Sequence, residues 1–225
     1  MKLPSLPLFL SFNGGYVDTL GFLALSGLFT AHVTGNFVTF GATVALGTAG
    51  ALPKLLALPV FCVVVFLTRL AGRCLQRRNR PVVWPLLFVK FLLLASVAIY
   101  VLYHGPFAAN ESLVMLVVGM TLVSAMAIQN AVHRAHLPKA PPSTLMTGTT
   151  TQIMLDLADI LAGERSEQIA SASARIKRMI VVVLTFAAGC SLGAVAFIAA
   201  PAGAFVVPAV VAAVGLFLNP EGSEG

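Results

Sequence analysis

The chain is built almost entirely of long apolar runs separated by short polar stretches. Eight apolar segments can be delimited, at about residues 8–28, 32–46, 55–75, 85–103, 113–132, 144–161, 179–199 and 202–218. A helix needs about 20 apolar residues to cross a bilayer, and six of these segments come near that length. The runs are continuous, whereas the strands of a membrane barrel would alternate with period two. The pattern therefore predicts an all-α membrane protein, with residues 1–225 forming a single transmembrane domain.

The second and sixth segments, 32–46 and 144–161, are shorter and more polar than the others. The sixth carries side chains that lipid would not solvate, namely Thr147, Thr149, Thr150, Thr151, Gln152, Asp156 and Asp159. Polar side chains at membrane depth face other helices or a water-filled cavity. We therefore expect both segments to be re-entrant or broken helices that line the interior.

The composition leaves no surface for a water-soluble domain. Only 10% of the residues are charged and 58% are hydrophobic, whereas a soluble domain carries about 25% charged residues. The net charge of +6 would suggest a nucleic-acid partner in a soluble protein. In a membrane protein, basic residues mark cytoplasmic loops and contact anionic lipid, and no nucleic-acid-binding motif is present. The expected partner is thus the lipid bilayer, with anionic lipid at the basic loops and no nucleic acid.

Basic residues gather at three places in the chain, and such clusters prefer the cytoplasmic side. They are Arg69, Arg73, Arg77, Arg78 and Arg80, then His133, Arg134, His136 and Lys139, and then Arg165, Arg175, Lys177 and Arg178. The stretch 104–112 has no Lys or Arg and should lie outside. Six full spans and two re-entrant segments place every basic cluster and both termini, with Lys2, on the cytoplasmic side of a bacterial inner membrane. An arrangement of seven spans, with only segment 144–161 re-entrant, is the alternative, and eight spans fit least.

Two similar motifs open the short segments, VTGN at 33–36 and MTGT at 146–149. Asp18 precedes the first Thr-Gly pair by 16 positions, and Asn130 precedes the second by 17. The segments that follow the two motifs carry their basic clusters at opposite ends, so the halves should have opposite orientations. Such inverted repeats are typical of secondary transporters. The predicted repeats cover about residues 8–103 and 113–218.

Four motifs carry this repeat, two in each half of the chain. In the first half they are GGYVDTLGF at 14–22 and HVTGN at 32–36, and in the second half AIQNA at 127–131 and LMTGT at 145–149. Together they resemble the YoaK family of bacterial membrane proteins, over nearly the whole chain. The resemblance implies a multi-pass inner-membrane protein and supplies no substrate. Because Thr149 stands where the first half has Asn36, the two halves need not contribute equally.

Asp18, near the middle of the first segment, carries the strongest functional signal. A carboxylate at the bilayer centre costs at least about 2.5–3.5 kcal/mol on insertion scales, so such residues are usually ion ligands, proton carriers or substrate contacts. The other interpretation is a helix-packing carboxylate that burial keeps protonated. Gly14, Gly15 and Gly21 flank Asp18 and suit a close approach of backbone or ligand.

The Thr-Gly motifs supply the other candidate residues. A helix amino terminus presents free N–H groups and partial positive charge to an anion, and Thr or Asn there caps the helix or binds a ligand. The predicted substrate-binding residues are Asp18, Thr34, Gly35, Asn36, Asn130, Thr147, Gly148 and Thr149. Coupling or cavity-lining roles are predicted for Asn13, Gln129, Gln152 and Asp156. Amides at this depth also hold helices together, and that alternative stays open.

Catalytic, metal and cofactor sites are not predicted. The chain has no nucleophile with a paired base, and His133 and His136 lack a nearby carboxylate or cysteine that would complete a metal site. Lys90, inside segment 85–103, is expected to reach the interface or to pair with a carboxylate such as Asp156.

The predicted function is therefore a small secondary transporter or channel-like permease, not an enzyme. Its substrate would be a small polar or anionic solute, with coupling to a proton or cation. A membrane-embedded enzyme acting on lipid and a structural or assembly protein are the alternatives. Transporters of this size often form homodimers, although no stretch of the sequence marks an interface.

Overall fold

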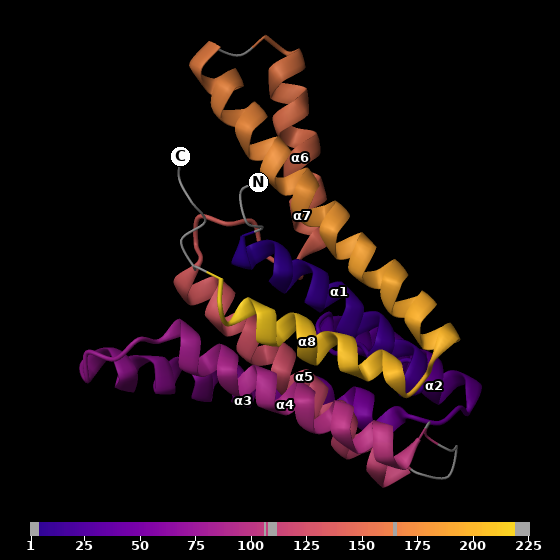
Figure 1. Ribbon diagram of the computed structural model, residues 1–225. Helices are drawn as coiled ribbons and strands as arrows, with labels where there is room; N and C mark the ends of the chain where they lie inside the picture. The colour runs from indigo at the N-terminus through magenta and orange to yellow at the C-terminus, as the bar shows by residue number, and fades with distance from the viewer. Residues whose placement is uncertain (1–4, 106, 108–111, 164–165, 219–225) are drawn as a thin grey trace.

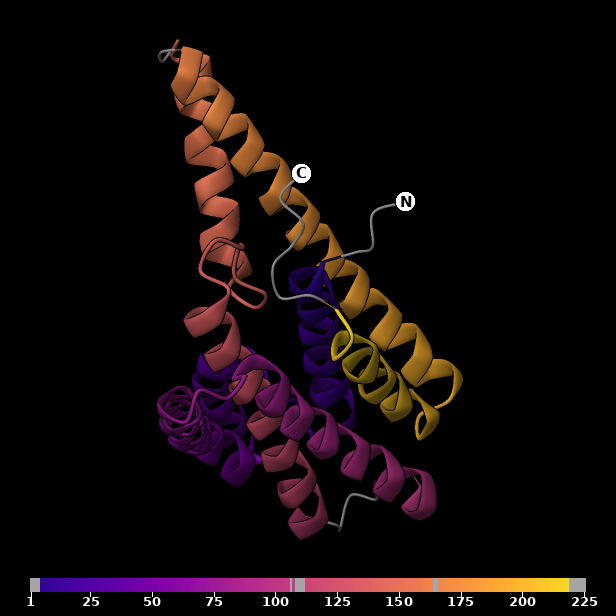
Figure 2. The same cartoon turned by 60° about the vertical axis from the view of Figure 1, so that its left-hand side comes forward.

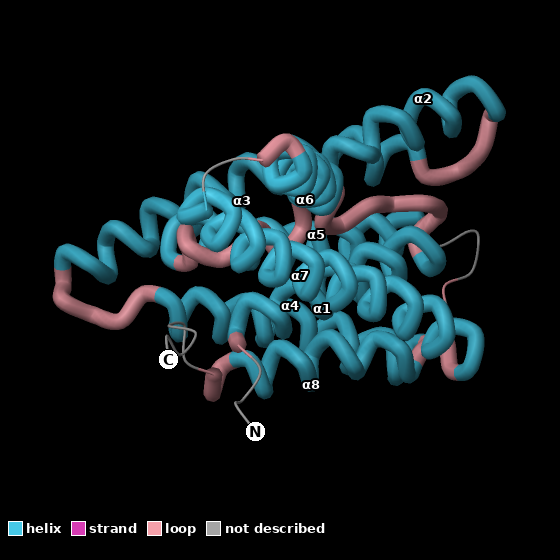
Figure 3. Tube along the Cα trace, turned by 90° about the horizontal axis from the view of Figure 1, so that it is seen from above, coloured by secondary structure: helices cyan, strands magenta, loops and turns pink. Residues whose placement is uncertain are grey.

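The structure, a computed structural model, describes residues 5–105, 107, 112–163 and 166–218 (Figure 1). Its helices are α1 (Leu6–Ala24), η1 (Val33–Gly35), α2 (Asn36–Leu46), α3 (Ala51–Arg77), α4 (Val83–His104), α5 (Ser112–His136), α6 (Met146–Leu161), α7 (Ser166–Ala199), η2 (Gly203–Phe205) and α8 (Val206–Gly215), where η marks a 3-10 helix. Within these ranges there is no strand (Figure 3), which confirms the all-helical fold class. Lys2, Arg165 and the polar end 219–225 lie outside the described residues.

Four of the described helices are long and apolar enough to cross a membrane, namely α3, α4, α5 from Leu113 and α7 from Ile169. The helices α1, with 19 residues, and α8, with 10, are not among them. The count of six full spans therefore stays a prediction. Large apolar side chains cover the outer faces of the long helices, as Phe66 of α3 and Leu102 of α4 illustrate. An exterior of this kind suits lipid, because large apolar patches exposed to water are unfavourable.

Two helices end or begin elsewhere than the apolar pattern predicts. Helix α1 stops at Ala24, before the predicted end at Leu28, because Ser26 and Gly27 adopt left-handed backbone conformations (φ 54° and 79°) that a right-handed helix does not contain. Helix α7 starts at Ser166, well before the predicted residue 179. The first turns of α7 are polar, so a segment delimited by its apolar residues does not include them.

Helix α1 lies at the centre of the molecule, in contact with α5, α7 and α8 (Figure 1). Glycines let the backbones of α1 and α7 touch where they cross. A Cβ on Gly15 would lie 2.2 Å from the Phe186 carbonyl oxygen, and one on Gly189 would lie 2.2 Å from that of Phe12. On the other side α5 packs against α3 and α4, and α4 reaches α8.

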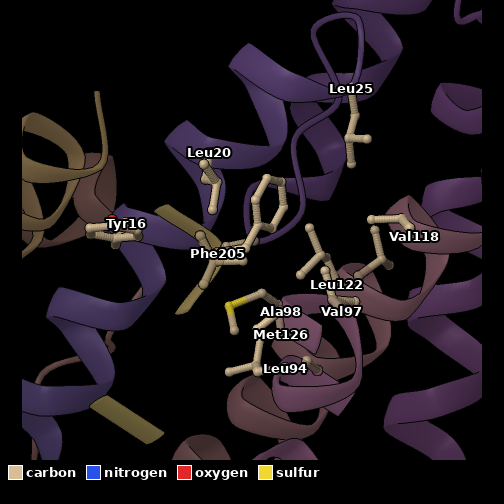
Figure 4. Packing of buried hydrophobic residues seen from close by; sticks show 14 of the residues in the cluster. Tyr16, Leu20, Leu25, Leu94, Val97, Ala98, Val118, Leu122, Met126 and Phe205 are labelled. Carbon is tan, nitrogen blue, oxygen red and sulfur yellow. The ribbon is translucent and has the colours of Figure 1, made fainter. Parts of the chain in front are cut away.

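The main apolar core forms where α1, α4, α5 and η2 come together (Figure 4). Leu20, Leu94, Leu122 and Phe205 each contribute a side chain that is almost fully buried. Burying a large apolar side chain stabilises a fold by about 1.5–3 kcal/mol when the alternative is water. This core fixes the carboxyl-terminal half of α1, where Asp18 is located.

Two short helices extend away from this core. Helix α6 packs on the amino-terminal part of α7, and these two segments project together from the remaining helices (Figures 1 and 2), while α2 packs on α3. A long non-helical stretch leads into each of them, residues 25–32 before η1 and α2, and residues 137–145 before α6. We call these the first and second entry stretches.

Candidate functional site

Asp18 holds the first entry stretch against α1. The residue is only 4% exposed. Its Oδ1 accepts the backbone N–H groups of Thr30 at 2.7 Å and Ala31 at 2.8 Å. Its Oδ2 lies 2.7 Å from Nδ1 of His32. Hydrogen bonds to an ionised acceptor are about twice as strong as neutral ones, so this carboxylate determines where the stretch turns back along the helix.

Asn36, at the start of α2, fixes the same stretch from its other side. Its Oδ1 accepts the backbone N–H of Phe29 at 2.9 Å, and its Nδ2 donates to the Phe29 carbonyl at 2.7 Å. The side chain is buried, and these two bonds occupy its amide. Gly35 packs on the Phe29 ring, where a Cβ would lie 3.0 Å from the nearest ring carbon. This part of the motif thus shapes the loop.

Asn130 of α5 holds the second entry stretch in a similar way. Its Oδ1 accepts a hydrogen bond from Oγ1 of Thr144 at 2.5 Å. Asn130 therefore plays the part in the second half that Asp18 plays in the first, with a neutral amide in place of the carboxylate. The Thr149 hydroxyl, one turn into α6, donates to the Leu145 carbonyl at 2.9 Å.

The two entry stretches meet beside α1. The His32 ring faces the backbone carbonyl of Thr144 and stands edge-on to Phe186 of α7, with ring centroids 5.4 Å apart. Gly14 lies against the same loop, because a Cβ there would lie 3.2 Å from the Thr144 methyl carbon. We call Asp18, His32, Asn130 and Thr144 the central site.

Three predicted binding residues lie at the surface near the entry stretches. Thr34, Thr147 and Gly148 are exposed, and nothing lies within 4 Å of a Cβ built on Gly148. Their hydroxyls and backbone stay accessible to a ligand, and their binding role remains a prediction.

A second polar group is buried between α1, α4 and α5. Lys90 of α4 is 1% exposed, and its Nζ donates to Oε1 of Gln129 at 2.5 Å. The Gln129 Nε2 donates to a backbone carbonyl of α1 at 2.8 Å and lies 3.3 Å from Oγ of Ser143. Asn13 is also buried, and its Nδ2 donates to the Pro208 carbonyl at 3.3 Å. The predicted cavity residues Asn13 and Gln129 therefore lie in the protein interior, next to the second entry stretch.

Asp156 belongs to a separate group in the projecting α6–α7 pair. Its carboxylate accepts hydrogen bonds from Arg175 Nε at 2.7 Å and Nη2 at 2.6 Å, and from Gln152 Nε2 at 2.7 Å. The expectation that Asp156 pairs with Lys90 is wrong. The neighbouring helix brings Arg175 to Asp156, whereas Lys90 points into the core and finds an amide.

Sequence reasoning left three residues of these groups out of the predicted site, namely His32, Thr144 and Lys90. His32 belongs to the motif HVTGN at 32–36. It follows Asp18 by 14 residues, and the sequence does not show that the intervening loop brings the two side chains together. Lys90 was visible as a lysine in an apolar segment, which is a signal of interior function.

Comparison with known proteins identifies the family. The sequence profile of a family described as "Protein of unknown function (DUF1275)" matches residues 6–218, so the chain belongs to this family. A relative from Bacillus subtilis (strain 168), named "UPF0700 transmembrane protein YoaK", is 27% identical over 157 residues, or 66% of this chain. The match spans 64% of that relative's own length, less than two thirds of it. No solved structure matches. The resemblance to the YoaK family is confirmed, and the chain is a membrane protein.

Proposed function

We propose that this member of the DUF1275 family is a small secondary transporter of the bacterial inner membrane, coupled to protons and carrying a small polar or anionic solute. The observation that carries the proposal is the meeting of the two entry stretches around the buried Asp18–His32 pair. Ionisable residues inside a membrane protein are costly and mark transport or proton pathways. Histidine is the side chain whose charge changes most readily near neutral pH.

The packing of the helices supports an inverted repeat in which α1–α4 match α5–α8. When the helices are matched in this way, each main contact between two helices has a counterpart. The α1–α7 contact corresponds to α5–α3, α8–α1 corresponds to α4–α5, and α2–α3 corresponds to α6–α7. Thr43 and Asp156 each stand seven residues after the matched Asn36 and Thr149 (43 − 36 and 156 − 149). Each ties its short helix to the next one, Thr43 by accepting a hydrogen bond from Lys54 at 2.5 Å and Asp156 by its ion pair with α7.

The basic residues on both sides of α6, together with the short lengths of α2 and α6, favour a re-entrant arrangement. With 11 and 16 residues these helices are about 16 and 24 Å long, less than the roughly 30 Å of hydrocarbon in a bilayer. Each begins next to the central site and leads outward. In this arrangement the basic residues on both sides of α6, such as Arg134 and Arg175, lie in the cytoplasm. Both termini are then cytoplasmic, and a count of six spans requires residues 203–215, which are as few as those of η1 and α2, to cross the membrane.

Proton binding at the central site would change how firmly the first entry stretch is held. A neutral Asp18 keeps weaker hydrogen bonds to Thr30 and Ala31 than an ionised one. His32 contacts Thr144 as well as Asp18, so the same event reaches the second entry stretch. The amino-terminal turns of α2 and α6 follow directly, and such turns offer N–H groups to an anion or a polar solute.

Proteoliposomes with a pH-sensitive dye inside test the proposal. Carboxylates, inorganic anions, amino acids and nucleobases are added outside in turn, and the proton movement that accompanies each is recorded. Asp18→Asn should abolish solute-driven proton movement. Asp159→Asn, the same change at an exposed position of α6, is the matched control and should behave as wild type. If Asp18→Asn kept the wild-type flux and pH dependence, the coupling role would be wrong.

A structural role in the membrane is the second candidate. The hydrogen bonds from Thr30 and Ala31 favour it, because a carboxylate that merely holds a loop makes the same bonds. This alternative predicts a lower melting temperature for Asp18→Asn and no solute-driven proton movement in the wild type.

A further inference from the structure

Lys90 has no acidic partner among the described residues. Asp18 is bound to His32, Asp156 to Arg175, and Asp159 is exposed on α6. An ammonium group has three N–H donors. Among the described residues, the interior supplies one acceptor for them, the neutral Oε1 of Gln129. A buried charge without a counter-charge is unfavourable, so the surroundings of Lys90 point to a missing partner.

A small cavity lies directly beside Lys90, between α1, α4 and α8. Its volume is about 10 Å³, and its lining includes Asn13, Leu87 and Ala212, which is room for about one water molecule. The Oδ1 of Asn13 is buried and has no hydrogen-bond partner. An occupant that accepts from Lys90 and donates to Asn13 would satisfy both side chains.

Hydrogen bonds and contacts connect this cavity to the central site. Lys90 donates to Gln129, whose Nε2 lies 3.3 Å from Oγ of Ser143. The next residue, Thr144, faces His32, which is bonded to Asp18. The buried cation and the buried carboxylate therefore belong to one polar network across the two entry stretches.

The charges of this network balance when Asp18, His32 and Lys90 hold one proton among them. With Asp18 ionised, His32 neutral and Lys90 protonated, the net charge is zero. Around Lys90, α5 contributes neutral Gln129, α1 contributes neutral Asn13, and the cavity residues of α8 are apolar. Around the Asp18–His32 pair, α7 contributes Cys190. A proton added to the pair leaves the charge of Lys90 uncompensated, and an anion beside Lys90 would restore the balance.

We propose that the Lys90 cavity is an anion subsite, loaded together with one proton on the Asp18–His32 pair. Its ligand is a small monovalent oxyanion whose own hydroxyl, or an accompanying water molecule, donates to Oδ1 of Asn13. The inference rests on the proposed transport function and names its substrate class. Transport is electroneutral, because each anion moves with one proton. The cavity has the size of one water molecule, so loading an oxyanion requires α8 to move away from α1.

The test uses the full chain in proteoliposomes, with sodium formate and sodium bicarbonate as probes and the internal pH as readout. An inward anion gradient should acidify the lumen faster than it does in protein-free liposomes, which formic acid and CO2 enter unaided, and this excess rate should not depend on an imposed membrane potential. Lys90→Gln should reduce this rate at least tenfold, and Lys90→Arg should retain part of it. Lys54→Gln is the matched control, since Lys54 is likewise buried and bonded to a neutral side chain, and it should transport as wild type.

Binding gives a second readout that does not depend on transport. Formate should raise the melting temperature of the wild-type protein in detergent more at low pH than at high pH. Lys90→Gln should fold, as size-exclusion chromatography can verify, and should lose this shift. Anion-driven acidification by Lys90→Gln at the wild-type rate would overturn the subsite. So would proton movement driven by cationic or neutral solutes and not by anions, although the proposed transport function would then stand. If no solute moved protons in the wild type, both proposals would fail.

Discussion

The crossing of α1 and α7 provides a direct test of the packing. In Gly189→Ala the new methyl group would lie 2.2 Å from the Phe12 carbonyl oxygen, whereas ordinary contacts begin at 3.4 Å. No side-chain rotation relieves the clash, because the obstacle is backbone. The two helices therefore have to separate by about 1 Å in an interior that packs as densely as a crystal.

The expected cost follows from this geometry. Overpacking a well-filled interior costs about 1–3 kcal/mol, and a backbone obstacle argues for the upper end. Replacing glycine by alanine inside a helix returns up to about 1 kcal/mol, so the net loss is about 2 kcal/mol. For a chain of this length that lowers the melting temperature by roughly 4–8 °C.

The assay is the loss of helical circular dichroism on heating in detergent. Gly15→Ala, on the facing helix, should cause a similar drop, and the double variant should fall by less than the sum because both act at one crossing. Gly41→Ala, inside α2 with nothing within 4 Å of the added Cβ, should melt at or above the wild-type temperature. Equal melting of Gly189→Ala and Gly41→Ala would refute the packing at this crossing.

Three further predictions concern the loops and the projecting helices. Asn36→Ala should destabilise the fold by about 1–3 kcal/mol, because it removes both hydrogen bonds to the Phe29 backbone, whereas exposed Thr34→Ala should stay within about 0.5 kcal/mol; thermal melting compares the two, and equal losses would contradict the assigned roles. A double-mutant cycle of Asp156→Ala and Arg175→Ala should give a coupling of about 1–2 kcal/mol, because the Asp156 side chain is only 1% exposed and both of its oxygens bond Arg175, while the 47% exposure of Arg175 lets solvent screen the pair; a coupling near zero would contradict this pairing. Ala162→Cys, at an exposed position with ordinary helical backbone and in a variant without Cys62, Cys74 and Cys190, should react with a membrane-impermeant thiol reagent only from the cytoplasmic side, and labelling from outside would rule out a re-entrant α6.

The helices could be predicted because their apolar runs are long and continuous, and the Thr-Gly motifs stand where α2 and α6 begin. The apolar pattern did not show that α8, with 10 residues, is shorter than both. The loop geometry could not be predicted, since the bond between Asp18 and His32 depends on how the first entry stretch folds back. The sequence shows which side chains are chemically able to pair, but not which of them the fold brings into contact. Lys90 illustrates this, because charge suggested a carboxylate while the fold supplied the amide of Gln129, 39 residues away.

Helices of the first half pack on helices of the second half, and this packing has a consequence for how the chain is inserted into the membrane. Helix α1 is made first, yet the helix whose backbone it touches, α7, is made almost last, and α3 waits for α5. While the ribosome completes the second half, the glycine face of α1 has no final neighbour in the bilayer. Contacts between distant parts of a chain form slowly, and exposed intermediates misassemble. The newly inserted first half should therefore depend on sheltering by the insertion machinery, and the protein should become resistant to proteolysis only after α7 has entered the membrane.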